Sequence, residues 1–292
     1  MLLMALLYLP MLYFNYNGKL FTDDTAVIST ASRGFRYGDG LFETIKCING
    51  QLILADEHFA RLWKGMGILQ FEIPKHFTPD TLEEAIITLA KKNGHDAAAR
   101  VRLTVTRGDG GLYDVVNHFP NYSIETWPLT NADTKITGLN SNGLVLGIYT
   151  EVKKSCDILS NLKHNNYLPY VMAALHAKKE KWNDAIILNT QERIADSTIA
   201  NIFFIKDGKI FTPPLKEGCV AGVVREALIK QLAVHNWELI ERPVMVEEIM
   251  QADEVFLTNS IYDIRWVQRI GDKEYVNTLT QKIYTTILPT IY

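Results

Sequence analysis

Two Asn-Gly pairs constrain the first part of this chain more than any other feature of its sequence. Asn17-Gly18 and Asn49-Gly50 each lie between apolar or alternating runs. An Asn-Gly pair suits a two-residue β-hairpin turn, because both residues accept the positive φ angles that such a turn requires. We therefore predict antiparallel strands on both sides of each pair, with residues 41–55 forming one complete hairpin.

Helical and strand-like segments follow the second pair. Apolar residues recur at helical spacing in residues 56–69, and residues 79–94 end in lysines and a glycine, as helices commonly do. Strand-like runs occupy residues 99–107 and 121–129. We interpret this first part as an α+β unit, and the polar, turn-rich segment after it as a linker.

The second part of the chain repeats this mixture. Strands are expected at 144–150, 185–190, 199–205, 209–213, 237–244 and 254–260, and helices after Lys163 and at 222–233, 247–252 and 279–288. The sequence therefore predicts an α/β (α+β) protein of two domains. The predicted limits are a small N-terminal domain at 1–127, a linker at 128–141 and a larger C-terminal domain at 142–292.

Composition excludes several classes of protein. The 292 residues are 47% apolar and 22% charged, as in a soluble protein with a sizeable core, and the net charge of −3 gives no footprint for nucleic acid or a membrane surface. The three cysteines lack the spacing of metal ligands and suit a reducing cytoplasm. The apolar residues 1–10 lack the basic start and cleavage site of a signal peptide. We expect them to form a buried strand or helix, or to precede the true start.

Lys163 is the first candidate for chemistry. It lies between an apolar run and a predicted helix, and no acidic residue is closer in sequence than Asp157. A desolvated amine can form a Schiff base with a carbonyl cofactor such as pyridoxal phosphate (PLP). PLP also needs an anion site for its phosphate, an acid beside its pyridine nitrogen and a donor for its phenolic oxygen.

Three further segments offer such groups. Gly222 precedes a predicted helix whose first amides, those of Val223 and Val224, can bind an anion. Thr258 and Ser260 supply hydroxyls at a predicted strand end, and Asp196 lies just before an apolar strand. Taken singly, each of these features also has an ordinary structural explanation. Lys163 fits a solvated loop lysine, Gly222 fits a plain loop-to-helix junction, and Asp196 fits an ordinary turn aspartate.

Taken together, seven segments carry a resemblance. They are RYGDGLFETIK, HFARL, TRGDGG, LKHNNYL, DSTIANIFF, GVVRE and ADEVFLTNS, and they occur in one order between about Tyr13 and Val267. In this order the sequence resembles the class IV (fold type IV) PLP-dependent aminotransferases. That family includes branched-chain aminotransferase, D-amino acid transaminase and 4-amino-4-deoxychorismate lyase.

The resemblance implies roles for the residues around the cofactor. Lys163 would be the Schiff-base lysine, which also moves the proton between cofactor and substrate. Arg61 would hold the phosphate with the amides of Val223 and Val224, beside Gly222, and with the hydroxyl of Ser260. Tyr167 would donate to the phenolic oxygen. Asp196 would lie beside the pyridine nitrogen, where the family usually has a glutamate that is one methylene longer.

The resemblance also implies a substrate site and an assembly. Phe42 and Glu43 would wall the pocket, and Arg102 would face the substrate carboxylate, with Arg36, Arg107 and His118 as further candidates. The implied cofactor is PLP and the implied assembly is a homodimer. The implied activity is transfer of an amino group between a branched-chain or D-amino acid and a 2-oxo acid by a ping-pong mechanism. The alternatives are a 4-amino-4-deoxychorismate lyase that releases pyruvate and p-aminobenzoate, and a PLP-binding protein without catalytic activity.

Overall fold

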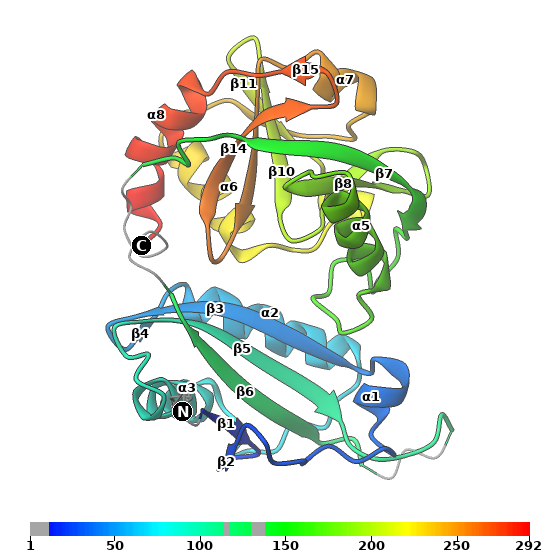
Figure 1. Ribbon diagram of the computed structural model, residues 1–292, viewed down its shortest axis with the longest axis vertical. Helices are drawn as coiled ribbons and strands as arrows, with labels where there is room; N and C mark the ends of the chain where they lie inside the picture. The colour runs from blue at the N-terminus through cyan, green and yellow to red at the C-terminus, as the bar shows by residue number, and fades with distance from the viewer. Residues whose placement is uncertain (1–11, 114–116, 130–137) are drawn as a thin grey trace, which may run out of the picture.

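The computed structural model describes residues 12–113, 117–129 and 138–292. Its strands form two sheets, one built from strands up to Pro128 and the other from strands starting at Leu144 (Figure 1). We call the parts that contain these sheets the first part and the second part. The predicted domain limits, at residues 127 and 142, fall close to this change from one sheet to the other, but they remain a prediction. The predicted linker lies largely outside the described residues. The apolar residues 1–10 also lie outside them.

The first sheet has the order β2-β1-β6-β5-β3-β4, and all neighbouring strands are antiparallel. Its strands are β1 (Tyr13–Tyr16), β2 (Lys19–Thr22), β3 (Gly40–Ile48), β4 (Gln51–Leu52), β5 (Ala98–Arg107) and β6 (Pro120–Pro128). Both predicted hairpins are confirmed. Asn17 and Gly18 join β1 to β2, Asn49 and Gly50 join β3 to β4, and all four residues have positive φ angles.

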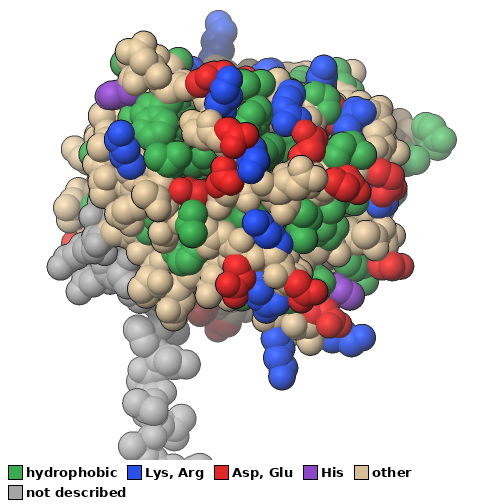
Figure 2. Space-filling view, turned by 90° about the horizontal axis from the view of Figure 1, so that it is seen from above, with side chains coloured by type: hydrophobic (Ala, Val, Ile, Leu, Met, Phe, Trp, Pro, Cys, Tyr) green, Lys and Arg blue, Asp and Glu red, His purple; other side chains and the backbone are tan. Residues whose placement is uncertain are grey.

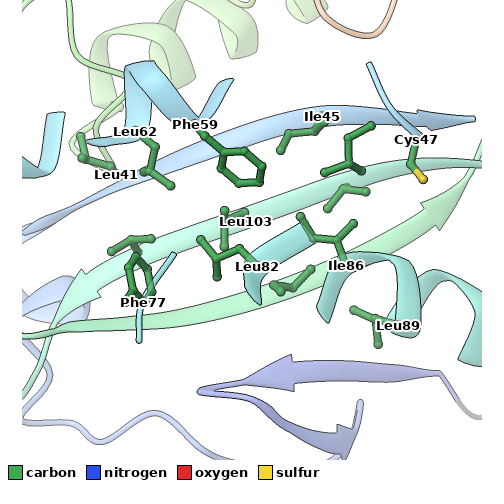
Figure 3. Packing of buried hydrophobic residues seen from close by; sticks show 14 of the residues in the cluster. Leu41, Ile45, Cys47, Phe59, Leu62, Phe77, Leu82, Ile86, Leu89 and Leu103 are labelled. Atoms are coloured by element: carbon green, nitrogen blue, oxygen red, sulfur yellow. The ribbon is translucent and has the colours of Figure 1, made fainter. Parts of the chain in front are cut away.

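The helices described beside this sheet are α1 (Arg33–Tyr37), α2 (Ala55–Ile68) and α3 (Pro79–Lys92). The hydroxyl of Thr78 caps the first turn of α3, and Pro79 starts that helix where a missing N–H costs nothing. Figure 3 shows how Phe59 and Leu62 of α2 and Leu82 of α3 gather with Leu103 of β5 in one apolar cluster. This core fixes α2 against the sheet.

The second sheet has the order β12-β11-β10-β13-β14-β7-β8-β9, with β15 paired to β14. Its strands are β7 (Leu144–Lys154), β8 (Asp184–Asn189), β9 (Ile194–Ser197), β10 (Asn201–Lys206), β11 (Lys209–Thr212), β12 (Leu239–Glu241), β13 (Glu254–Asn259), β14 (Asp263–Ile270) and β15 (Lys273–Glu274). Parallel and antiparallel pairs are mixed. The sequence did not predict β9 or β14, the strand that joins β13 to β7.

The helices of the second part are α5 (Leu168–Lys179), α6 (Val223–Val234), α7 (Val246–Met250) and α8 (Thr278–Thr286), with short 3₁₀ turns at Leu215–Glu217 and Leu288–Thr290. Leu228 and Leu232 of α6 pack with Phe203 and Phe256 of the sheet, and Phe203 and Phe256 stack at 5.0 Å. This packing fixes the direction of α6, whose first turn reaches the cavity described below.

The surface shows no single dominant charge in the view of Figure 2, where acidic and basic side chains alternate with apolar ones. In the part of the chain that the structure describes, no helix is long and apolar enough to cross a membrane. Within the same residues, no group of three or more His, Cys, Asp or Glu side chains is arranged to hold a metal ion.

Candidate active site

A cavity of about 450 Å³ is lined by side chains from both parts of the molecule. This volume is within the range of small-molecule sites. All the residues predicted for the site line it except Glu43 and the three further candidates Arg36, Arg107 and His118, and the hydroxyl-bearing Thr258 lines it as well. The seven segments that carry the family resemblance are far apart in sequence, so the fold is what brings these side chains together.

Backbone hydrogen bonds join the segment around Lys163 to strand β3 of the first sheet. The N–H of Phe42 donates to the carbonyl of Lys163 at 2.8 Å, and the N–H of Asn165 donates to the carbonyl of Gly40 at 3.0 Å. Gly40 permits this close approach, because a Cβ there would meet Nδ2 of Asn165 at 2.7 Å. The lysine of the second part is therefore positioned by a strand of the first.

The Lys163 amine is in an environment that favours its neutral form. Its Nζ lies 4.5 Å from the ring centroid of Phe42 and 5.9 Å from that of Tyr167. Burial lowers the pKa of Lys163 to about 7, and the positive charge of Arg61 acts in the same direction. A large fraction of the amine is thus uncharged near neutral pH, as a nucleophilic amine requires.

Arg61 is held by Glu43, and alternation along β3 explains why. Successive side chains of a strand point to opposite faces, so Phe42 lines the cavity while Glu43 points the other way. The buried Glu43 carboxylate accepts from Nε of Arg61 at 2.8 Å and also from its Nη2. It accepts a third bond, at 2.7 Å, from Nδ1 of His58. The sequence predicted that Glu43 would form part of the cavity wall. In the structure it lies behind that wall and contacts Arg61 instead.

The charges of this buried cluster follow from its contacts. Burial alone would raise the pKa of Glu43, but Arg61 and His58 outweigh it and hold that pKa at about 2. Burial lowers the pKa of His58, so the imidazole is neutral and acts as a hydrogen-bond donor to the carboxylate. Arg61 also donates to the carbonyl of Ala221 at 2.8 Å, which leaves two of its five N–H donors for a ligand.

Hydrogen-bond donors that the described part of the protein leaves without partners gather at the end of the cavity around the first turn of α6. The amides of Val223 and Val224 open this helix and have no acceptor among the described residues. Thr258 is buried, and its hydroxyl also lacks a hydrogen-bond partner within those residues. Gly222 is needed for packing, because a Cβ there would meet Oδ1 of Asn201 at 1.9 Å. Ser260 also lines the cavity.

Asp196 lies on β9 rather than in a turn, and it is 2% exposed. Its carboxylate accepts from the N–H of Val220 at 2.9 Å and from the hydroxyl of Tyr170 at 3.1 Å. Burial raises the pKa of Asp196, although Lys154 and these hydrogen bonds act against the rise. Tyr167 stacks on Tyr170 with 4.2 Å between ring centroids, and burial raises its pKa, so its phenol is a neutral donor.

Two arginines line the cavity from β5. The alternation of this strand buries Val101 and Leu103 in the core and directs Arg100 and Arg102 to the opposite face, where both line the cavity. Arg102 stacks on Phe42, with 4.0 Å from its guanidinium carbon to the ring centroid.

The three further arginine and histidine candidates lie elsewhere. Arg107 is a buried structural residue that pairs with Asp39 at 3.1 Å and bonds His118 at 2.8 Å. Arg36 donates to the carbonyl of Thr30 at 2.7 Å. These contacts occupy the side chains away from the cavity, and none of the three candidates lines it.

Sequence reasoning missed several residues that the fold places at the cavity. Arg100, Asn165 and Tyr170 line it, and Lys154 lies behind Tyr170. Arg100 could have been found from the strand alternation, since it lies two residues before Arg102. Tyr170 and Lys154 carry no comparable signal, because only the fold brings the end of β7 beside α5.

Comparisons with known proteins agree with this site. The model of the family "Amino-transferase class IV" matches residues 40–270, so the chain belongs to the class IV aminotransferases, as the motif order predicted. Enzymes of this family depend on PLP. The chain is 29% identical to the aminodeoxychorismate lyase of Vibrio harveyi over 85% of its own length and 89% of that protein. It is 27% identical to the branched-chain-amino-acid aminotransferase of Salmonella typhimurium, over 88% and 84% of the two chains.

The fold comparison confirms the predicted fold type IV architecture. The crystal structure of branched-chain aminotransferase from Thermoproteus uzoniensis with norvaline superimposes with a TM-score of 0.83. The match covers 96% of this chain and 95% of that one, at 24% identity. At this identity the likeness establishes the fold and leaves the substrate open.

Proposed function

We propose that this protein is a PLP-dependent aminotransferase that moves an amino group between an amino acid and a 2-oxo acid. The observation that carries the proposal is Lys163, an amine with a pKa of about 7 in a cavity that also holds an acid and an anion-binding end. When bound, PLP would supply the electron sink that makes the α-hydrogen of an amino acid acidic.

The residues of the cavity fit PLP. The two spare N–H donors of Arg61, the free amides of Val223 and Val224 and the unpartnered Thr258 hydroxyl can together receive a phosphate. Ser260 would add a second hydroxyl there. A buried hydroxyl and free amides without partners are costly in an apolar interior, so their presence supports a polar ligand at this end.

The remaining residues divide the chemistry among them. Lys163 would attach the cofactor, and its neutral form can then take up the α-proton of the substrate. Asp196 would keep a proton on the pyridine nitrogen through its negative charge. Tyr167 would donate to the phenolic oxygen, and Phe42 would close the substrate side. Arg102, which stacks on Phe42, would receive the substrate carboxylate.

The second candidate function is release of pyruvate from 4-amino-4-deoxychorismate. Arg100 and Arg102 both line the cavity, and two guanidinium groups suit a substrate that carries two carboxylates. The similarity to the Vibrio harveyi lyase supports the same candidate. A branched-chain or D-amino acid with one carboxylate and an apolar side chain would use Arg102 and Phe42 instead.

One experiment tests cofactor attachment. The purified protein is incubated with PLP and reduced with borohydride, and peptides are analysed by mass spectrometry. We expect the cofactor on the peptide that contains Lys163, and no label after Lys163→Ala. Label at another lysine, or none in the parent protein, would contradict the proposed site.

A second experiment identifies the reaction. Holoprotein is mixed separately with branched-chain L-amino acids, with D-amino acids and with 4-amino-4-deoxychorismate, while cofactor absorbance and pyruvate release are followed. Conversion of the cofactor to its amine form by an amino acid supports transfer, and pyruvate release supports the lyase. Attachment of PLP without either response would support a PLP-binding protein that lacks catalysis.

We also propose a homodimer. Leu168, Val171, Met172 and Leu175 form an exposed apolar stripe along α5, at helical spacing. Light scattering of the purified protein is expected to give twice the chain mass of 33.2 kDa. Replacing Met172 and Leu175 by glutamate is expected to shift the protein towards monomer. A monomeric parent protein would rule this assembly out.

A further inference from the structure

Lys154 is a buried lysine that makes no ion pair with any carboxylate the structure describes. It is the last residue of β7 and is 6% exposed. Its Nζ donates to the carbonyl of Ser160 at 3.0 Å and to the hydroxyl of Tyr170. Within residues 12–113, 117–129 and 138–292, no carboxylate lies in salt-bridge contact with it. Because lysines are rarely buried unless paired, another group must balance this charge.

Tyr170 connects that charge to the cavity. The phenol is 4% exposed, and its hydroxyl lies 3.2 Å from Oδ1 and 3.1 Å from Oδ2 of Asp196. A tyrosine hydroxyl can accept one hydrogen bond and donate another at the same time. Donation from Lys154 polarises the hydroxyl and strengthens its own donation to Asp196. Lys154, Tyr170 and Asp196 thus form a continuous chain of hydrogen bonds from the interior to the cavity wall. We call this chain the relay.

Asp196 needs such support to remain charged. A carboxylate removed from water tends to take up a proton, and Asp196 is 2% exposed. Among the influences that oppose its burial, the charge of Lys154 is the largest, followed by the hydrogen bonds from Val220 and Tyr170. Asp196 is also one methylene shorter than the usual glutamate, so its direction depends more on the groups behind it.

We propose that Lys154 and Tyr170 are positioning residues that hold Asp196 ionised and fixed at the cavity wall. The relevance of this relay to catalysis rests on the proposed function, in which Asp196 serves the pyridine nitrogen. The other titratable groups facing Asp196 are Lys163, Tyr167 and Cys219. Burial raises the pKa values of Tyr167 and Cys219, so both are neutral and cannot replace the charge of Lys154.

The relay is tested in the protein without cofactor. Aspartate labelled with ¹³C at its carboxyl carbon is introduced, and the Asp196 signal is assigned from its loss in Asp196→Asn. Its NMR titration midpoint is then compared in the parent protein, Tyr170→Phe and Lys154→Met. We expect the midpoint to rise by about 1–2 pH units in both variants, the shift produced by losing one charge-assisted hydrogen bond.

Tyr275→Phe is the matched control. Tyr275 is also buried, and its hydroxyl donates to the carbonyl of Ile249 at 2.9 Å, away from the cavity. Its loss should leave the Asp196 midpoint unchanged. An unchanged midpoint in a folded Tyr170→Phe or Lys154→Met protein would overturn the relay, and if one of these variants does not fold, the other decides.

A second readout separates the relay from the proposed function. With ¹⁵N-labelled PLP bound, the ring nitrogen should lose its proton at lower pH in Tyr170→Phe than in the parent protein. If Asp196 shifts in the cofactor-free protein while Asp196→Asn leaves turnover unchanged, the relay stands and the role of Asp196 in the proposed function fails.

Discussion

Replacing Glu43 with glutamine tests the buried cluster that aims Arg61 into the cavity. Glu43 is 1% exposed and accepts hydrogen bonds from Arg61 and from the neutral His58. Glutamine preserves the volume but removes the negative charge, so Arg61 loses its only acidic partner in the described part of the chain. Breaking one side of a buried ion pair is costly, because the remaining charge stays out of water.

The size of the effect follows from the pKa of Glu43. Folding lowers that pKa from an ordinary 4.5 to about 2, which corresponds to about 3 kcal/mol of stability at pH 7. Because the pKa is lower in the folded protein, this stabilisation is present above pH 4.5 and is lost as the pH falls towards 2. The difference in unfolding free energy between parent and Glu43→Gln should therefore shrink by about 2 kcal/mol between pH 7 and pH 3.

Urea unfolding followed by circular dichroism at the two pH values measures this difference. Glu192→Gln is the control, since Glu192 pairs with Lys153 at 2.6 Å on the surface and its side chain is 65% exposed. An exposed pair of this kind contributes less than about 1 kcal/mol. If Glu43→Gln is as stable as the parent at pH 7, or the difference is the same at pH 3, the ion pair does not have the strength assigned here.

Three further predictions concern the cavity. The rate at which the cofactor-free protein attaches PLP, followed by absorbance, should rise with pH through about 7, and a midpoint near 10.5 would contradict the lowered pKa of Lys163. Arg61→Ala should weaken PLP binding about ten- to a hundred-fold in equilibrium dialysis, whereas unchanged affinity would remove Arg61 from the phosphate site. Asp196→Asn should slow removal of the substrate α-proton about a hundred-fold in stopped-flow measurements, with Asp196→Glu retaining most of the rate. An Asp196→Asn protein as fast as the parent would show that another acid serves the cofactor ring.

Local signals in the sequence were sufficient to predict most of the helices and strands. The Asn-Gly pairs set two hairpins because their positive φ angles are a local requirement, and the lysines and glycine at residues 91–94 marked the end of a helix in the same way. β14 was missed because its residues, DIRWVQRI, mix charged and apolar side chains without clear alternation. Its position between β13 and β7 is set by long-range pairing, which no short window contains.

The candidate site was predictable where a motif names the residue type. Lys163, Arg61 and Val223 were placed at the cavity by the order of the family segments, and the structure brings them together there. Glu43 differs because adjacent strand residues face opposite ways, so a motif shared with Phe42 does not mean a shared direction. Tyr170 was missed because its importance depends on Lys154, a residue from another element that becomes its neighbour only after folding.

The backbone hydrogen bonds between the Lys163 segment and β3 limit which chimeras of this protein and its relatives can work. Phe42 and Gly40 of the first part hold the Lys163 and Asn165 backbone of the second. A chimera that joins one half of this chain to the other half of a relative must reproduce that register, or the amine moves away from Arg61 even when each half folds. A chimera is thus expected to have either the complete site or no working site. Chimeras that remain active should have their junction outside the stretch from Gly40 to Asn165, so that this stretch comes from one parent.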